Sequence, residues 1–576
     1  MFELSQQKQE LLKESGNIII LGGPGSGKTT IALLKANYII EKEELKDGQN
    51  VVFLSFARAT VARVEQQTGI LASRSIRKRI EINTYHGFTW NILRSFGYLL
   101  KQKFPFQLLT PPEAAARLAG IKGKEARKKE KLRLIDEEAL LHFDLFANIA
   151  IELLSRSNSL LTIISDSYPV IILDEFQDTN EDEWNFIKLL GRKSRLIALA
   201  DAEQRIYEFR GADPKRISDF IKEFQPKQYD FGFENNRSDG TDILQFGNDL
   251  LTGENKIKAY QDVYCIRYPF RRGQGIHLDL KLEVIKSCRR LINLDKDNWS
   301  IAILLPTKNL MLDVSKFLLS KQTLANGTAL PEINHEVALE TAGPSLAAIV
   351  IGGLLENNNS QDEIADRLIR NLCEHIRGRK GDEPANQHQL SLSNALLDFL
   401  ESRKVRGKNR KICIDECFRI ANECKNYNLS GNPAEDWVSI RNMLINSKCN
   451  EIKQIAIDAQ YLRLLGKGAQ LRSSLGELWR NYGNYSGATK SVRDSLLKEH
   501  FVASTRVWAG IQVMTMHKAK GKEFDEVIVY EGLHQGKIAN NRNLEQSRLN
   551  LRVSVTRAMK RATILTPASD ICEFLV

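Results

Sequence analysis

At 576 residues, the chain is too long for a single hydrophobic core, so several domains are expected. A hydrophobic fraction of 42% and a charged fraction of 27% are typical of a soluble globular protein, and the net charge of +11 favours a polyanionic partner. No apolar run reaches the ~18–20 residues that a membrane span requires, and the first residues lack the pattern of a signal peptide, so we expect a cytoplasmic protein.

The first 90 residues alternate between predicted strands and helices. Short apolar runs predict strands at 18–21, 51–54 and 80–82. This order implies a parallel sheet covered by helices. From about 95 to 165 the composition predicts helices instead, before strand character returns at 170–173 and 196–200. We therefore expect a helical module inserted into a first α/β domain.

A second α/β pattern follows and is also interrupted. Its predicted strands are 301–305, 513–516, 527–530 and 563–565, whereas residues from about 346 to 500 are helical and polar. The predicted fold class is thus α/β, with two parallel-sheet domains that each carry a mainly helical insertion. The predicted boundaries are 1–94, 95–165 (insertion) and 166–225 for the first domain, and 226–345, 346–500 (insertion) and 501–576 for the second.

Basic clusters and cysteines carry weaker signals. Basic residues gather at 74–79, 122–133 and 403–411, where a nucleic-acid contact and an ordinary solvated helix face are equally good interpretations. The eight cysteines include no CxxC pair. Cys413, Cys417 and Cys424 lie close together, but their spacing fits no common metal site, so we interpret them as reduced thiols.

A glycine-rich loop between the first strand and the first helix is the strongest motif. It matches GxxxxGK[ST], in which backbone N–H groups and the helix N-terminus face phosphates. The Lys28 side chain can reach the β- and γ-phosphates, and the Thr29 hydroxyl can ligate Mg²⁺. The residues assigned to the phosphate cradle are Gly22, Gly23, Pro24, Gly25, Ser26, Gly27, Lys28, Thr29 and Thr30.

An acidic pair supplies the second half of such a site. Asp174 and Glu175 follow an apolar strand at 170–173. In this position Asp174 is expected to hold Mg²⁺, and Glu175 is expected to polarise the attacking water. The sequence therefore predicts an enzyme that uses ATP and Mg²⁺.

The segment that begins with this pair, DEFQDTN at 174–180, resembles the signature of UvrD/Rep/PcrA helicases of superfamily 1. Further segments resemble that family in the family's own order. They are INTYHG (82–87), ADAEQRIYEFRGA (200–212), FENNRS (233–238), MTMHKAKGKEF (514–524) and VSVTRA (553–558). The resemblance spans nearly the whole chain and implies two RecA-like P-loop domains with ATP in the cleft between them.

The resemblance also implies roles around the nucleotide. Gln204 is expected to touch the γ-phosphate, Arg237 and Arg557 to act as arginine fingers, and Glu523 to contact the nucleotide. A guanidinium suits a phosphoryl transition state because it keeps its charge and offers paired donors. Gln7 resembles the adenine-reading glutamine, with Gln9 as the alternative. Asn236 stands where the family has a tyrosine that stacks on adenine.

A second set of residues resembles the family's contacts to single-stranded DNA. Such tracks combine aromatic stacking with contacts to the backbone. Phe209 replaces the family's tryptophan, and a smaller ring can still stack. The expected DNA-binding residues are Phe56, His86, Tyr207, Phe209, Arg210, Thr515 and His517.

Three functions are compatible with these residues. The leading hypothesis is an ATP-dependent translocase or helicase on single-stranded DNA, or on a duplex with a single-stranded end, moving 3′ to 5′ by resemblance. The alternative is a DNA-stimulated ATPase subunit that activates a partner nuclease, as in anti-phage systems such as Gabija. A nucleotide sensor without catalysis is disfavoured, because a sensor needs neither the water-polarising Glu175 nor two guanidiniums.

Overall fold

The computed structural model describes residues 5–23, 25–42, 45–56, 58–100, 105–201, 215–232, 240–270, 275–294, 299–324, 326–337, 342–381, 385–460, 470–501, 509–533, 535–539 and 544–575. Their contacts divide the chain into two compact units. The sheet unit comprises 1–89, 150–339 and 503–576, and the helical unit comprises 90–149 and 340–502. Each unit is described by itself.

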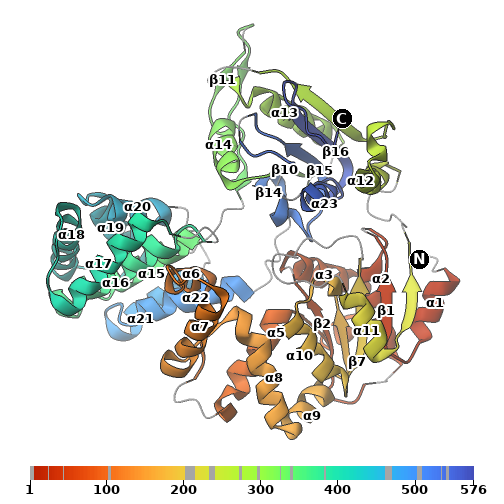
Figure 1. The fold of residues 1–576 in the computed structure, drawn as a ribbon, viewed down its shortest axis with the longest axis horizontal. Coiled ribbons are helices and arrows are strands. Elements are labelled where there is room, and N and C mark those ends of the chain that lie inside the picture. The colour runs from red at the N-terminus through yellow and green to blue at the C-terminus, as the bar shows by residue number, and fades with distance from the viewer. Residues whose placement is uncertain are drawn as a thin grey trace. The chain divides into compact units, whose positions relative to one another are not determined.

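The sheet unit contains two six-stranded parallel sheets (Figure 1). In the N-terminal sheet the strand order is β3-β2-β6-β7-β1-β8. Its strands are β1 (Ile18–Leu21), β2 (Val51–Ser55), β3 (Ile80–Thr84), β6 (Val170–Leu173), β7 (Arg195–Ala200) and β8 (Lys227–Asp230). The inner strands are almost wholly apolar and buried, as expected for a parallel sheet covered on both faces.

The C-terminal sheet repeats this architecture with the order β13-β14-β10-β15-β16-β9. Its strands are β9 (Val263–Tyr268), β10 (Ser300–Leu305), β13 (Glu336–Val337), β14 (Gly510–Thr515), β15 (Phe524–Tyr530) and β16 (Ala558–Pro567). The predicted fold class, with two RecA-like sheets and helical regions, is confirmed.

Helices connect these strands, because parallel strands need a crossover. Around the N-terminal sheet they are α1 (Gln6–Lys13), α2 (Lys28–Glu41), α3 (Arg58–Leu71), α4 (Arg74–Arg77), α5 (Tyr85–Phe96), α9 (Asn158–Ser167), α10 (Glu181–Gly191) and α11 (Arg216–Phe224). Around the C-terminal sheet they are α12 (Ile243–Thr252), α13 (Leu278–Asn293), α14 (Lys308–Leu318) and α23 (Leu544–Val555).

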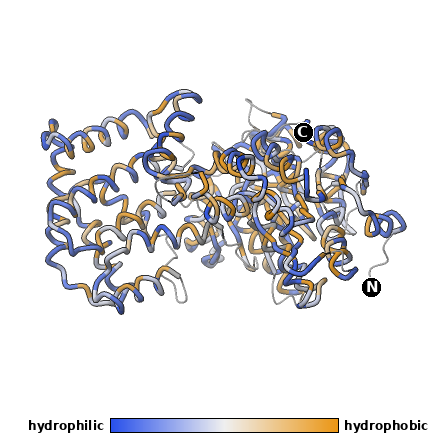
Figure 2. The backbone as a smooth tube through the Cα atoms, turned by 90° about the horizontal axis from the view of Figure 1, so that it is seen from below, coloured by the Kyte–Doolittle hydropathy of each residue, from blue (hydrophilic) through white to orange (hydrophobic). Residues whose placement is uncertain are grey.

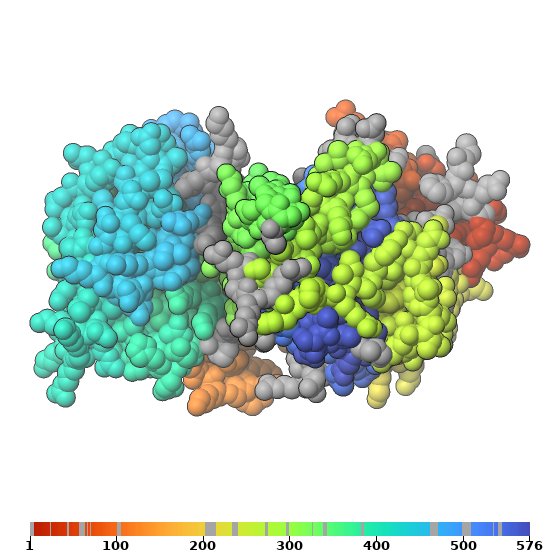
Figure 3. All heavy atoms as spheres, turned by 90° about the horizontal axis from the view of Figure 1, so that it is seen from above, coloured from red at the N-terminus to blue at the C-terminus, as the bar shows by residue number. Residues whose placement is uncertain are grey.

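The helical unit is built around one apolar helix, α15 (Ala342–Leu355), which is buried along nearly its whole length. A helix that is apolar on every side needs partners all round. Its neighbours include α6 (Pro111–Arg117), α16 (Gln361–Gly378), α18 (Lys408–Lys425), α19 (Pro433–Ile445), α20 (Asn450–Ala459) and α22 (Ala488–Phe501). Figure 2 shows hydrophobic and hydrophilic stretches alternating along these helices, and in Figure 3 the cyan atoms of this unit form a continuous mass.

The rest of the unit is also mainly helical. It includes α7 (Lys124–Glu138), α17 (Gln387–Ser402), α21 (Gln470–Tyr482) and the first residues of α8 (Phe146–Arg156). Two short strands, β4 (Gln107–Leu109) and β5 (Leu140–His142), pair in parallel inside the stretch that the sequence predicted as helical. Among the described residues, no helix combines the length and the apolar character needed to cross a membrane.

One predicted strand limit is wrong, and some edge strands were not predicted. Residue Met516 was expected in a strand, but β14 ends at Thr515 and a 3₁₀ turn, Met516–Ala519, follows. The strands β8 and β9 were not predicted. Both lie at sheet edges, and most of their residues are exposed or half-buried. Edge strands lack the continuous apolar run that identifies an inner strand.

Candidate functional site

The phosphate cradle lies between β1 and α2, as the motif predicts. Gly25 and Gly27 have φ angles of 81° and 83°, a left-handed backbone that favours glycine. The Lys28 ammonium donates hydrogen bonds to the carbonyls of Gly22 (2.6 Å) and Gly23 (2.9 Å), so its charge is folded over the loop. These contacts hold the lysine where it can meet a bound phosphate.

The cradle also contains a buried hydroxyl. Ser26 is 1% exposed, and among the described residues its Oγ has no hydrogen-bond partner. Buried polar groups nearly always have a partner, so this hydroxyl is suited to a ligand oxygen. The Thr29 side chain beside it is also buried. An oxygen atom of a bound phosphate could accept a hydrogen bond from the Ser26 hydroxyl.

The predicted acidic pair stands at the carboxyl end of β6. Asp174 is 5% exposed, and its Oδ2 accepts a hydrogen bond from the Ser55 hydroxyl at 3.1 Å. Because Ser55 ends the adjacent strand β2, this contact fixes the carboxylate at the carboxyl ends of the strands. With the Thr29 hydroxyl, Asp174 provides hard oxygen donors of the type that Mg²⁺ prefers.

Glu175 adopts a conformation that is rare for a residue with a side chain. Its φ is +52°, in the left-handed region, where a non-glycine backbone is strained. The Gln177 amide donates to its carboxylate at 2.6 Å, and the same side chain accepts a hydrogen bond from the Asp201 backbone at 3.1 Å. Gln177 therefore ties Glu175 to the end of β7 and sets the direction of the carboxylate.

Cations hold Glu175 in its charged form. Burial acts to raise the pKa of this carboxyl, but the charges of Lys520 and Lys28, the hydrogen bond from Gln177 and the charge of Arg557 together keep the pKa below its ordinary value. The Lys520 ammonium lies 3.9 Å from Glu175 and also donates to Asp178. An ionised carboxylate surrounded by cations is suited to accept a proton or orient water.

Two of these cations come from the part of the chain that forms the C-terminal sheet. Lys520 follows the 3₁₀ turn after β14, and Arg557 follows α23. Arg557 is 2% exposed, and its Nε donates to the Val553 carbonyl at 2.9 Å. The predicted finger residue Arg557 thus acts on the carboxylate beside which the water would be placed.

Lys520 was missed by the residue-level sequence analysis. The family-like segment at 514–524 contains it, but no role was predicted for this lysine. Its partner Asp178 lies 342 positions away, so no local pattern could reveal the pair. In the sequence, the one feature that could have pointed to Lys520 is its place before Gly521 in the family-like segment.

The adenine-side candidates lie at the surface. The Gln7 amide donates to the Asp230 carbonyl at 3.3 Å, and Gln9 is exposed. Because Asp230 ends β8 beside β1, Gln7 lies near the carboxyl ends of the strands, as the cradle does. Glu523 is half-buried just before β15.

Phe56, one of the predicted DNA-binding residues, belongs to a stacked aromatic pair. Phe56 stacks on Tyr85 with ring centroids 4.3 Å apart and an interplanar angle of 24°. The Tyr85 hydroxyl in turn donates to the Asp174 carbonyl at 3.4 Å. Phe56 is half-buried, which leaves part of its surface accessible to a ligand. A ring stack followed by a hydrogen bond therefore joins a stacking candidate to the acidic pair.

The other DNA candidates are placed separately. His86 lies in α5, with its Nε2 3.7 Å from the Glu183 carboxylate. Thr515 is half-buried at the end of β14, and His517 is exposed in the following turn. Six predicted residues fall outside the described residues: Pro24, Gln204, Tyr207, Phe209, Arg210 and Arg237. Asn236 also falls outside them.

The clustered cysteines are buried free thiols. Cys413, Cys417 and Cys424 belong to the core of the helical unit. The Cys413 sulfur lies 2.6 Å from the sulfur of Cys449, a contact that the sequence analysis did not predict. With the Glu451 carboxylate, these two thiols form a group of three potential metal ligands.

Comparison with known families matches both ends of the chain. Residues 4–136 and 125–225 match the UvrD/REP helicase N-terminal domain, and residues 469–568 match the UvrD-like helicase C-terminal domain. The matched segments contain the phosphate cradle, the acidic pair, Lys520 and Arg557.

Individual relatives extend the match along the chain. DNA helicase II of Escherichia coli is 21% identical over 97% of this chain and 83% of its own length. The ATP-dependent DNA helicase PcrA of Staphylococcus aureus is 20% identical over 96% of this chain and 82% of its own length. A probable DNA helicase II homolog of Mycoplasma genitalium is 26% identical over 44% of this chain and 43% of its own length.

Proposed function

The chain belongs to the UvrD/REP helicase family, and we propose that it couples ATP hydrolysis to 3′-to-5′ movement along single-stranded DNA. At the coarser level it is an ATP-dependent DNA helicase of the UvrD/PcrA type. The direction of movement, the residue roles and the six-segment domain division given above belong to the proposal.

One observation carries the chemical part of the proposal. Lys520, from the other half of the sheet unit, lies 3.9 Å from the Glu175 carboxylate, and the charges of Lys28 and Arg557 also lower the pKa of that carboxyl. In the proposed reaction, Lys28 binds the terminal phosphates and Glu175 orients the attacking water. Arg557 and Lys520 oppose the charge that develops in the transition state. Gln204 and Arg237 are proposed to join them.

Mg²⁺ is the implied cofactor. The buried Asp174 carboxylate and the Thr29 hydroxyl fit a small divalent cation, because both offer oxygen ligands beside the cradle. The bound ion would neutralise phosphate charge. The Ser55 hydroxyl keeps Asp174 oriented toward that task.

Coupling to DNA is proposed to run through Phe56 and Tyr85. Because Tyr85 stacks on Phe56 and bonds to the Asp174 backbone, a change at the nucleotide site can alter the stacking surface. The proposed DNA-binding set is completed by His86, Tyr207, Phe209, Arg210, Thr515 and His517.

The direction of movement can be tested with two partial duplexes. One carries a single-stranded 3′ tail and the other a 5′ tail of equal length and sequence. We expect ATP-dependent unwinding of the 3′-tailed substrate only. Preferential unwinding of the 5′-tailed substrate would overturn the proposed direction but not the family assignment.

The second proposed role places the same motor beside a nuclease. Purification with the products of neighbouring genes, followed by assays of hydrolysis, unwinding and cleavage, separates the two roles. Cleavage that depends on the Glu175 carboxylate favours the nuclease complex. Unwinding without any cleavage favours the motor alone.

A further inference from the structure

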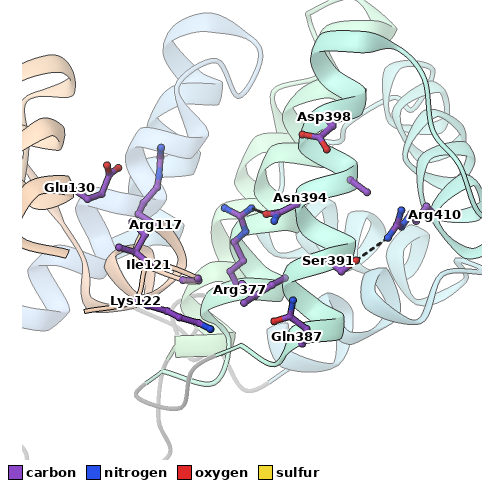
Figure 4. Close-up of a pocket in the computed structure, with 14 residues that line it drawn as sticks. Arg117, Ile121, Lys122, Glu130, Arg377, Gln387, Ser391, Asn394, Asp398 and Arg410 are labelled. Carbon is purple, nitrogen blue, oxygen red and sulfur yellow. Dashed lines mark hydrogen bonds between the residues drawn. The ribbon is translucent and has the colours of Figure 1, made fainter. Parts of the chain in front are cut away.

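A polar cavity of about 800 Å³ lies in the helical unit, and none of the residues assigned to ATP or DNA is among those that line it. Its walls are the segment 117–122 with Glu130, the end of α16, one face of α17 and the start of α18 (Figure 4). One basic residue from each of two clusters seen in the sequence, Lys122 of 122–133 and Arg410 of 403–411, therefore lines the same cavity.

Positive charge dominates the lining. Four cations, Arg117, Lys122, Arg377 and Arg410, face two carboxylates. One of these, Glu130, accepts hydrogen bonds from Nη2 and Nε of Arg133 at 2.8 and 3.0 Å, and this contact lowers the pKa of Glu130. Arg133 compensates Glu130 from outside the cavity, and Arg117 pairs with Glu374 at 3.2 Å and Glu138 at 3.5 Å, which also lie outside the lining. Lys122, Arg377 and Arg410 then face one remaining carboxylate, Asp398, which leaves a net positive interior.

The two central arginines are held by neutral groups. The Arg377 guanidinium donates to the Ser393 hydroxyl at 2.8 Å and to the Asn394 amide oxygen at 2.6 Å. Arg410 donates to the Ser391 hydroxyl at 2.9 Å, and Figure 4 shows both arginines reaching α17 from opposite sides. These bonds orient the guanidiniums without neutralising them, which prepares them for an anion.

Helix ends add to the positive field. Lys122 lies two residues before α7, Gln387 is the first residue of α17, and Arg410 is the third residue of α18. The N-terminus of a helix carries a positive partial charge and favours anions. The first turn of α18 contains no acidic residue but does contain Lys408 and Arg410. These positive side chains lie at a helix end where negative charge is favoured. A bound anion would turn this unfavourable local arrangement into a favourable one.

From these contacts we propose that the cavity binds a phosphorylated small molecule of about nucleotide size, at a site separate from the phosphate cradle. Its volume lies within the ~300–1,000 Å³ usual for small-ligand pockets. Arg377 and Arg410 bind phosphate oxygens as paired donors, Lys122 contributes a mobile charge from the rim, and the Asn394 and Gln387 amides read the remaining polar groups.

The test is calorimetric titration with ATP and, separately, with inorganic pyrophosphate, in a Lys28→Ala background that weakens the phosphate cradle. We expect one remaining saturable site. Arg377→Ala combined with Arg410→Ala should weaken it by roughly tenfold or more, since each charge-assisted hydrogen bond contributes strongly. Ser391→Glu should do the same, because it places a carboxylate beside Arg410 at an exposed position where folding tolerates it.

The matched control is Arg403→Ala. Arg403 belongs to the same basic cluster but pairs with Asp366 at 2.6 Å and does not line the cavity. Its removal should leave the affinity unchanged. The proposal is overturned by an absence of saturable binding at millimolar ligand, or by equal affinity in Ser391→Glu. Binding of a short DNA duplex that excludes both small anions also overturns it, since the surface would then be a nucleic-acid contact.

Discussion

The phosphate cradle and the cavity of the helical unit are both positively charged, but they use charge differently. At the sheet edge, Lys520 and Lys28 oppose a carboxylate, Glu175, that is partly buried and strained. In the cavity, Arg377 and Arg410 donate hydrogen bonds to neutral hydroxyl and amide groups. Buried cations beside a carboxylate suit catalysis, because they keep the carboxylate ionised and able to act on the attacking water. Oriented but uncompensated charges suit binding.

The largest expected effect tests the catalytic half of this comparison. Glu175→Gln removes the charge but keeps the size and the hydrogen bond with Gln177. ATP hydrolysis should fall on the order of 10²–10⁴-fold, as for loss of a positioned general base, whereas ATP and DNA binding should persist. Steady-state turnover and equilibrium binding measure the two effects. A variant with near-normal turnover would remove Glu175 from its assigned role.

Lys520→Ala should have the next largest effect. Loss of its positive charge should lower turnover by about 10², a typical value for one transition-state donor. Because Lys520 lowers the pKa of Glu175, its loss raises that pKa, and the acid limb of the pH–rate profile should move to higher pH.

The control for Lys520 is Lys537→Ala, which breaks a surface ion pair with Asp570. Its pH–rate profile should match that of the unchanged protein. An acid limb that stays in place in Lys520→Ala would mean that Lys520 does not act on Glu175.

Phe56→Ala tests the proposed DNA track. Loss of a stacking ring should weaken single-strand affinity by ~1–3 kcal/mol, and the same range is expected for Phe209→Ala. Phe56→Tyr keeps the ring and should bind almost normally. Fluorescence anisotropy with a labelled oligonucleotide provides the measurement. If Phe56→Ala binds as well as the unchanged protein, Phe56 serves only to pack against Tyr85.

The smallest effect is expected for the exposed pair of Arg403 and Asp366. Because the Arg403 guanidinium is solvated, Arg403→Ala should change the free energy of unfolding only slightly. Urea denaturation measures this value. A much larger loss would show that the basic cluster is structural, and it would remove Arg403 as a control for the cavity.

The sequence predicted the features that depend on local chemistry. Glycines at 25 and 27, the lysine after them and the acidic pair after an apolar strand are each set by a few adjacent residues. The inner strands were equally clear because they are continuously apolar. Edge strands such as β8 were missed, since polar residues on an edge resemble a loop.

Features made by distant residues could not be predicted in the same way. The contact of Lys520 with Asp178 depends on the folding of both sheets. The cavity depends on the meeting of segments near 120 and 410, of which the sequence showed only the separate charges. The stacking of Phe56 on Tyr85 likewise needs β2 and β3 to be neighbours.

The central claim is that ATP hydrolysis at the Glu175 site is coupled to single-stranded DNA. The most direct test is the rate of ATP turnover with and without a single-stranded oligonucleotide, measured for the unchanged protein and for Lys28→Ala. We expect DNA to stimulate turnover and Lys28→Ala to abolish it in both conditions. Turnover that is undetectable throughout, or that ignores both DNA and the loss of Lys28, would contradict the account.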